Sequence, residues 1–141
     1  MPAVILQALL LLGLAFLPAI GQAVYYGPRA GWSAPAMSSD EVKLEDAQAW
    51  GNSVMWVDAR PDEQFEQAHI PTAISLNEDR WNELLPQMLA AWSPAKRVVV
   101  YCSSRSCQAS HEVARRLREE AQLKDVFVLH GGWEKWLEAK K

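Results

Sequence analysis

Cysteine is scarce in this chain, which has only two, Cys102 and Cys107, among its 141 residues. A small secreted domain held together by disulfides normally carries about four or more, so a disulfide scaffold is excluded. Two cysteines inside one short loop cannot hold a fold together. Their closeness in the sequence indicates chemistry at that loop.

The chain also lacks an excess of basic residues. Its 14 Lys and Arg are outnumbered by 17 Asp and Glu, which gives a formal net charge of −3. Nucleic-acid binding needs a concentrated basic patch, and the arginines within 115–118 are flanked by glutamates that can pair with them along a helix. We therefore expect no nucleic acid among the partners.

Charged side chains are absent from residues 1–24. Residues 3–24 are almost wholly apolar, and about 20 apolar residues suffice to span a bilayer. Tyr25 and Tyr26 follow where an interfacial aromatic belt would lie. We expect an N-terminal hydrophobic helix that is an uncleaved membrane anchor or a signal segment cleaved near Ala23, with a buried helix as the remaining alternative.

The orientation of this segment is weakly encoded, since no Lys or Arg precedes it. By default such an anchor leaves the following domain on the far side of the membrane, which in a bacterium is the periplasm. We expect a membrane-anchored protein with a periplasmic domain, or one released to the periplasm after cleavage. Residues 25–39, rich in small residues and proline, are expected to form a linker, and residues 40–141 the globular domain.

Strand and helix patterns alternate through the globular domain. The expected strands are short apolar runs at residues 54–57, 73–76, 98–101 and 126–129. The expected helices are residues 44–50, 61–67, 81–92 and 107–121, with a last one through Trp133, Trp136 and Leu137. This alternation predicts an α/β domain with a mainly parallel sheet covered on both faces.

The loop after residues 98–101 holds both cysteines. Cys102 follows the strand directly, at the carboxyl edge where open α/β sheets gather reactive groups. Backbone N–H groups entering the next helix, the positive end of that helix and Arg105 would favour a thiolate able to attack a sulfane sulfur. The same N–H groups would then stabilise the persulfide. The alternative is that Cys102 is a small buried residue at a strand end.

Several blocks of the chain resemble the rhodanese family. Residues 57–65 (VDARPDEQF) resemble its Asp-x-Arg block, and residues 69–73 (HIPTA) its Gly-His-Ile-x-Gly-Ala block. Residues 98–102 (VVVYC) resemble the strand that ends in the catalytic cysteine, and residues 129–136 (LHGGWEKW) the closing block. The resemblance covers about residues 40–140 in the family's order.

The resemblance implies a mostly parallel, five-stranded sheet with helices on both faces. It also implies a sulfurtransferase that moves sulfane sulfur, from thiosulfate or a persulfide, to a thiophilic acceptor through a persulfide on the nucleophile Cys102. The loop residues that would bind the donor are Ser103, Ser104, Arg105, Ser106 and Cys107. The acceptor, a small thiol or a protein, stays open, and no cofactor is implied.

The loop departs from the family pattern. The family often has glycine three places and arginine five places after the catalytic cysteine, where this chain has Arg105 and Cys107. Ala68 and Thr72 also replace usual glycines. Substrate preference therefore cannot be carried over. Membrane-associated rhodanese-like proteins with a Cys-x-x-x-x-Cys loop are similar to this arrangement.

Cys107 has three interpretations: a resolving thiol that attacks the persulfide or forms a reversible disulfide with Cys102, a small residue facing the core, or a soft-metal ligand. Two thiolates make an incomplete metal site, so no metal is expected. Two functions compete with sulfur transfer, a dithiol redox or sulfur-relay module and a non-catalytic tethered binding module. A cysteine phosphatase is disfavoured because Gln108 stands where its phosphate-clamping arginine would be.

Other residues near strand ends have expected roles. Asp58 and Arg60 are expected to form an ion pair or a cap, and His69 a fixed structural hydrogen bond. His130, before the paired glycines, could line a pocket, whereas Trp133 and Trp136 are expected in the core and at its rim.

Overall fold

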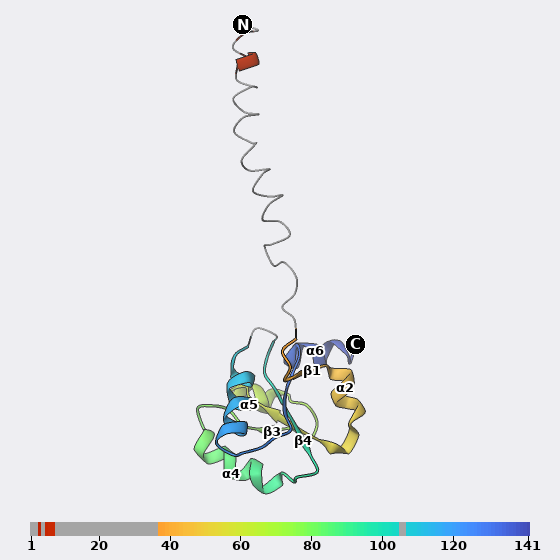
Figure 1. Cartoon of the computed structure of the whole chain (residues 1–141), viewed down its shortest axis with the longest axis vertical. Helices are drawn as coiled ribbons and strands as arrows, with labels where there is room; N and C mark the ends of the chain where they lie inside the picture. Colours follow the sequence, from red (N-terminus) through yellow and green to blue (C-terminus); the bar gives the residue numbers. More distant parts are fainter. Residues whose placement is uncertain (1–2, 4, 8–36, 105–106) are drawn as a thin grey trace. The chain divides into compact units, whose positions relative to one another are not determined.

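The structure, a computed structural model, describes residue 3, residues 5–7, residues 37–104 and residues 107–141 (Figure 1). The chain divides into two units, Met1–Ala36 and Met37–Lys141. Most of the predicted N-terminal helix and linker therefore lies outside the described residues, although residues 3 and 5–7 are helical. Among the residues that are described, no helix combines the length and apolarity needed to cross a bilayer.

The second unit is built on a five-stranded sheet whose strands all run parallel. From one edge to the other, the strands are β1 (Glu41–Val42), β5 (Val126–Leu129), β4 (Arg97–Tyr101), β2 (Val54–Asp58) and β3 (Ile74–Ser75). Asp58 lies opposite Tyr101, so β2 and β4 end level with each other at the same edge. The predicted α/β class and five-stranded parallel sheet are confirmed.

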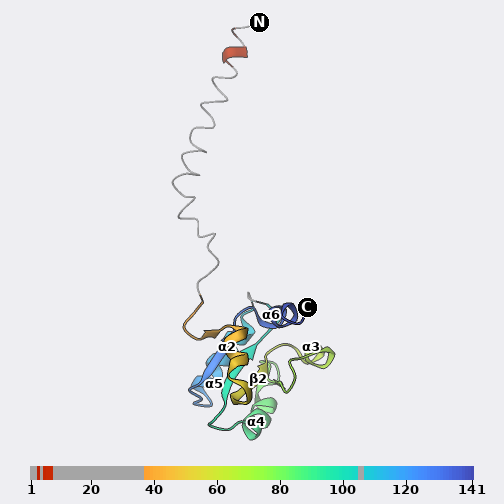
Figure 2. The ribbon, with the colours of Figure 1, turned by 90° about the vertical axis from the view of Figure 1, so that its right-hand side faces the viewer.

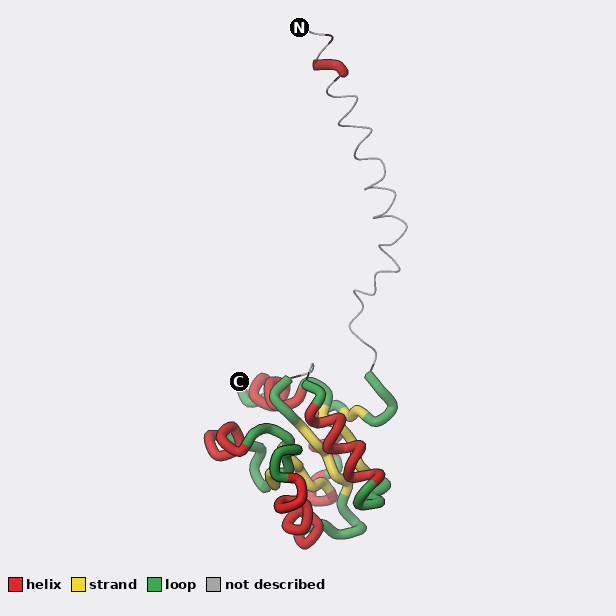
Figure 3. The backbone as a smooth tube through the Cα atoms, turned by 90° about the vertical axis from the view of Figure 1, so that its left-hand side faces the viewer, coloured by secondary structure: helices red, strands yellow, loops and turns green. Residues whose placement is uncertain are grey.

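Helices cover both faces of this sheet (Figures 1 and 2). The helices are α2 (Leu44–Ala49), α3 (Asp62–Gln67), α4 (Trp81–Ala91), α5 (Ala109–Glu119) and α6 (Gly132–Glu138), with a 3₁₀ turn η1 (Gly51–Ser53). One face packs against α4 and α5, and the other against α2, α3 and α6. In Figure 3 the yellow strands accordingly lie between red helices.

The central strands are buried on both faces, which is why they read as continuous apolar runs. Successive residues alternate between the two cores because side chains of a strand point to opposite faces. In β2, Met55 and Val57 face α4 and α5, while Trp56 packs on the opposite side. The two cores fix the position of the strand ends, where the cysteine loop begins.

Element ends differ from the predictions for local reasons. β1 was not predicted because Glu41 and Val42 form no apolar run. Helix α5 begins at Ala109, two residues later than predicted, because the Cys107 N–H turns back to the Ser104 carbonyl at 3.2 Å. Helix α3 begins after Pro61, whose ψ of 148° is extended rather than helical.

Candidate active site

The candidate site is the loop that joins β4 to α5. Because β4 ends at Tyr101, Cys102 lies at the carboxyl edge of the strand in the middle of the sheet. Cys102 and Cys107 form a disulfide, and their Cα atoms are 6.3 Å apart, within the span of a disulfide. The structure thus joins the two cysteines. Arg105 and Ser106, also predicted to bind the donor, lie outside the described residues.

The two cysteines differ in exposure. Cys102 is 1 % exposed and belongs to the core that faces α4 and α5, whereas Cys107 is half-buried against that core. In place of an open thiolate at the mouth of the loop, the structure shows the two alternatives that the sequence also allowed, a buried Cys102 and a disulfide between Cys102 and Cys107. Cys102 is covered because it directly follows the buried run 98–101 of β4.

The amino end of α6 holds the cysteine loop in place. The N–H of Trp133 donates to the Cys102 carbonyl at 2.7 Å, and the N–H of Glu134 to the Ser103 carbonyl at 3.1 Å. In a planar trans peptide the C=O and the next N–H point in opposite directions. The N–H groups of Ser103 and Ser104 are therefore directed away from α6.

Gly132 makes this close approach possible. Its φ is +55°, in the left-handed region that favours glycine, and a Cβ there would overlap the Cys102 carbonyl oxygen. The same Cβ would lie 3.3 Å from the Ser104 nitrogen. The contact between α6 and the loop thus requires Gly132, the second of the paired glycines, whereas a Cβ at Gly131 would meet the Lys135 side chain.

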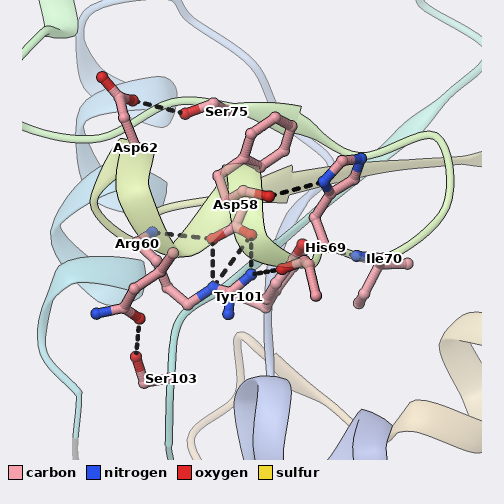
Figure 4. A network of polar contacts seen from close by, with 11 residues as sticks. Asp58, Arg60, Asp62, His69, Ile70, Ser75, Tyr101 and Ser103 are labelled. Atoms are coloured by element: carbon pink, nitrogen blue, oxygen red, sulfur yellow. Dashed lines mark hydrogen bonds and ion pairs between the residues drawn. The ribbon is translucent and has the colours of Figure 1, made fainter.

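A buried ion pair lies beside the loop (Figure 4). Arg60 donates from Nε to Asp58 Oδ1 at 2.9 Å and from Nη2 to Oδ2 at 2.6 Å, with exposures of 4 % and 0 % for the two residues. Burial alone would lower the pKa of Arg60, but the hydrogen bonds and charge of Asp58 outweigh it and raise that pKa. Arg60 therefore stays charged, and the predicted ion pair is confirmed.

This ion pair connects β2 to the cysteine loop through aromatic rings. The Arg60 guanidinium lies 4.5 Å from the centre of the Trp133 ring and 5.6 Å from that of Tyr101. The Tyr101 hydroxyl accepts a hydrogen bond from the Ile70 N–H at 3.0 Å. Burial and the Asp58 carboxylate raise the pKa of Tyr101, which stays a neutral phenol. The backbone N–H of Trp133 in turn donates to the Cys102 carbonyl. The ion pair therefore supports the loop through Trp133.

The loop also contacts α3. Ser103 Oγ donates to Gln64 Oε1 at 3.0 Å. A hollow of about 310 Å³ lies beside this contact, lined by Arg60, Gln64, Gln67, Ala68, Ser103, Trp133 and Glu134. Sequence reasoning missed Gln64 because nothing in a surface helix pattern marks one polar residue over another.

The histidines lie in structural contacts. His69 Nδ1 lies 2.9 Å from the Phe65 carbonyl oxygen, which confirms its predicted hydrogen bond. His130 Nδ1 and His111 Nε2 lie 3.1 and 3.5 Å from the two carboxylate oxygens of Glu41. These contacts tie β1 to α5 and to the residue that follows β5. Within residues 37–104 and 107–141, no three His, Cys, Asp or Glu side chains converge as metal ligands would.

Comparisons with known proteins agree with this geometry. A model of the rhodanese-like domain family matches residues 41–139. No curated protein matches the sequence.

Solved structures share the fold. A Bacillus halodurans protein is 24% identical, with a TM-score of 0.61, over 87% of this chain and 82% of its own. A rhodanese-like domain protein from Staphylococcus aureus is 23% identical, with a TM-score of 0.52, over 69% of this chain and 90% of its own. A Rhodopseudomonas palustris protein, described as a possible tyrosine phosphatase, is 19% identical with a TM-score of 0.53, over 77% and 97%. At these identities, the likeness is one of fold.

Proposed function

Because this chain belongs to the rhodanese-like domain family, we propose that it is a sulfurtransferase whose Cys102 carries sulfane sulfur as a persulfide. The observation that carries the proposal is the place of Cys102, directly after the central strand at the carboxyl edge of a parallel sheet. The N–H groups of Ser103 and Ser104, which α6 directs away from itself, support a stabilising environment for an anionic sulfur.

The proposed cycle has two transfers at sulfur. The Cys102 thiolate attacks the sulfane sulfur of thiosulfate, the sulfur–sulfur bond of the donor breaks, and sulfite leaves with the electron pair. The product is a persulfide anion on Cys102. A thiolate or another thiophilic acceptor, small or protein-borne, then attacks the outer sulfur, and Cys102 leaves as a thiolate ready for the next donor.

The cycle starts from the reduced loop. In the disulfide the Cys102 sulfur is bonded to Cys107 and its side chain is covered, so neither a thiolate nor access for a donor is present. Two electrons must first be supplied by a thiol reductant. The disulfide is therefore the oxidised form, which the proposed enzyme must leave before it can react.

The proposal is tested with the full chain after reduction. Incubation with thiosulfate should add one sulfur atom, seen by peptide mass as a gain of about 32 Da on the peptide that holds Cys102, and cyanide should then release thiocyanate. Cys102→Ser should lose both signals, and Cys107→Ser should keep the adduct. Absence of any adduct on Cys102 in the reduced protein would overturn the proposal.

A second candidate function, a dithiol redox or sulfur-relay module, is favoured by the Cys102–Cys107 disulfide. In this function the loop exchanges electrons with a thiol partner and needs no sulfane donor. Titration in a thiol redox buffer should give a two-electron transition between disulfide and dithiol. Two free thiols in the most oxidising buffer would reject it.

A non-catalytic binding module would instead keep its full function in Cys102→Ser.

Phosphatase chemistry is a weaker alternative, suggested by the description of the Rhodopseudomonas palustris protein. A phosphate clamp needs an arginine, and the described residue at that place is the amide Gln108. We expect no hydrolysis of an aryl phosphate by the reduced chain. Turnover of that substrate, lost in Cys102→Ser, would reverse this conclusion.

We also propose a membrane location, with the domain in the periplasm. The support is the uncharged apolar stretch of residues 3–24. Cell fractionation of the full chain tests it, with a protease added outside an opened outer membrane. We expect the intact chain in the membrane fraction before protease is added, and digestion of its domain afterwards. Soluble chain trimmed near Ala23 would support the cleaved form instead, and full protection from the protease would overturn the orientation.

A further inference from the structure

We propose that the Cys102–Cys107 disulfide is opened from one side: a reducing thiolate attacks the sulfur of Cys107, and Cys102 leaves as the thiolate. The two sulfurs have the same chemistry, so access and the stability of the leaving group decide which one is attacked. The inference rests on the proposed function in one respect, because it delivers Cys102 in the form that accepts sulfane sulfur.

Access differs sharply between the two cysteines. A thiolate must approach the attacked sulfur along the line of the sulfur–sulfur bond. Cys102 is 1 % exposed and packs among core residues, so an attacking group at its sulfur would have to enter the core. Cys107 is half-buried at the other end of the loop and is followed by the exposed Gln108. A reductant of any size therefore meets Cys107 first.

The surroundings of the leaving sulfur favour the same direction. When Cys107 is attacked, negative charge develops on Cys102, which is followed by the peptide N–H groups of Ser103 and Ser104. The carbonyls of Cys102 and Ser103 are occupied by Trp133 and Glu134 of α6. The carbonyl oxygens, which would repel the charge, are thus held toward α6. These contacts keep the two carbonyl oxygens on the side of α6, which supports Cys102 as the leaving group that the sulfur transfer needs.

The partner implied is a dithiol reductant. Its first thiolate forms a mixed disulfide with Cys107 as the Cys102–Cys107 bond breaks. Its second thiolate then attacks its own first sulfur in that mixed disulfide, which releases Cys107 as a thiolate. The reductant becomes a disulfide, and the loop gains two electrons and, in neutral form, two protons. A reagent with one thiol forms the same mixed disulfide on Cys107 but needs a second molecule to resolve it, so the intermediate accumulates at low concentration and after a short exposure.

The test uses the oxidised full chain and glutathione as the probe. After a brief exposure, acid stops the exchange and an alkylating reagent marks free thiols. Cleavage after Arg105 separates the peptide that holds Cys102 from the one that holds Cys107. We expect glutathione on Cys107 and the alkyl group on Cys102, with at least a tenfold excess over the reverse pattern, where a factor of ten corresponds to about 1.4 kcal/mol.

The matched control is the same oxidised chain unfolded in urea. Without the fold, the burial difference is gone, and glutathione should be found on both cysteines in comparable amounts. Equal labelling of the folded chain, or glutathione mainly on Cys102, would overturn the inference. So would the same strong preference in urea, because the preference would then come from the local sequence and not from burial.

A sulfur-transfer measurement keeps this inference separate from the proposed function. The fully reduced chain is treated with thiosulfate in parallel. Selective attack on Cys107 without a sulfur adduct on Cys102 would support the inference and reject the sulfurtransferase. An adduct on Cys102 with unselective glutathione labelling would support the sulfurtransferase and reject the inference.

Discussion

At the scale of the residue, Gly132 is the place where one methyl group would disturb the cysteine loop. Gly132→Ala should lower the free energy of unfolding by about 1–2 kcal/mol because alanine disfavours the left-handed backbone. The overlap of its Cβ with the Cys102 carbonyl should lower it by about 1–3 kcal/mol more. Gly51→Ala is the matched control, since Gly51 has a φ of +56° and open space around its would-be Cβ. Urea denaturation measures both variants, and equal losses would contradict the prediction.

Arg60 offers a second test of how the loop is supported. Arg60→Met leaves the buried Asp58 carboxylate without its partner, which should lower the free energy of unfolding by about 3–5 kcal/mol. The double variant Asp58→Asn with Arg60→Met should recover much of that loss. Lys135→Met, which breaks the exposed pair with Glu138, should cost less than about 1 kcal/mol. A non-additive double-variant cycle in denaturant is expected, and additive losses would count against the buried pair.

Residue chemistry was predictable where it lies within one short segment. The two cysteines stand five positions apart, and Asp58 and Arg60 two apart, so the sequence itself brings each pair together. The contact between Arg60 and Trp133 was not predictable, because it depends on how α6 packs against β2. Burial of Cys102 was expected only as the alternative, because the core that covers it is built with α4 and α5 and not from the loop's residues alone.

At the scale of the element, Asp62 links the start of α3 to β3 and to the turn before α4. Its carboxylate accepts hydrogen bonds from Arg80 Nη1 at 2.6 Å, Asn77 Nδ2 at 2.7 Å and Ser75 Oγ at 3.3 Å. The hydrogen bond from Arg80 is the largest cause that lowers the pKa of Asp62 below its ordinary value of about 3.9. Its ionised form is therefore favoured by folding.

This shift predicts an acid-side loss of stability. The contribution of Asp62 is full above the pKa of the unfolded chain and disappears as the pH falls through the lowered pKa of the folded protein. The melting temperature should drop on acidification below about pH 4, and Asp62→Asn should show a shallower drop. Arg80→Gln, which removes the strongest donor, should flatten the profile as well. Profiles that match the wild type in both variants would contradict the prediction.

Elements were predictable where the sequence carries an apolar run or a helical periodicity. The run 98–101 was recognised because a strand buried on both faces is continuously apolar, and it proved to be the central β4. Strand β1, with two residues, carries no pattern of its own and exists because Glu41 and Val42 pair with β5. The start of α5 depends on where the cysteine loop turns, which periodicity does not encode.

At the scale of the whole molecule, the fold should not depend on the disulfide. The bond closes a segment with a sequence separation of 5, which constrains the unfolded chain little. Chain entropy for so short a loop gives about 2 kcal/mol at most, whereas both cores of the sheet stay intact. Reduction should lower the urea midpoint modestly and leave one cooperative transition. Cys107→Ser should not respond to reductant, and unfolding of the wild type by reductant alone would contradict the prediction.

Because every strand of the sheet runs the same way, the chain enters all of its strands along one rim and leaves them along the other. The cysteine loop occupies the exit rim, while the exposed Lys124 precedes β5 on the entry rim. A fluorophore or a surface tether attached at Lys124 would therefore stand a full strand length from the sulfur atoms. Immobilised protein could be oxidised, reduced and loaded repeatedly with its reactive side facing the liquid.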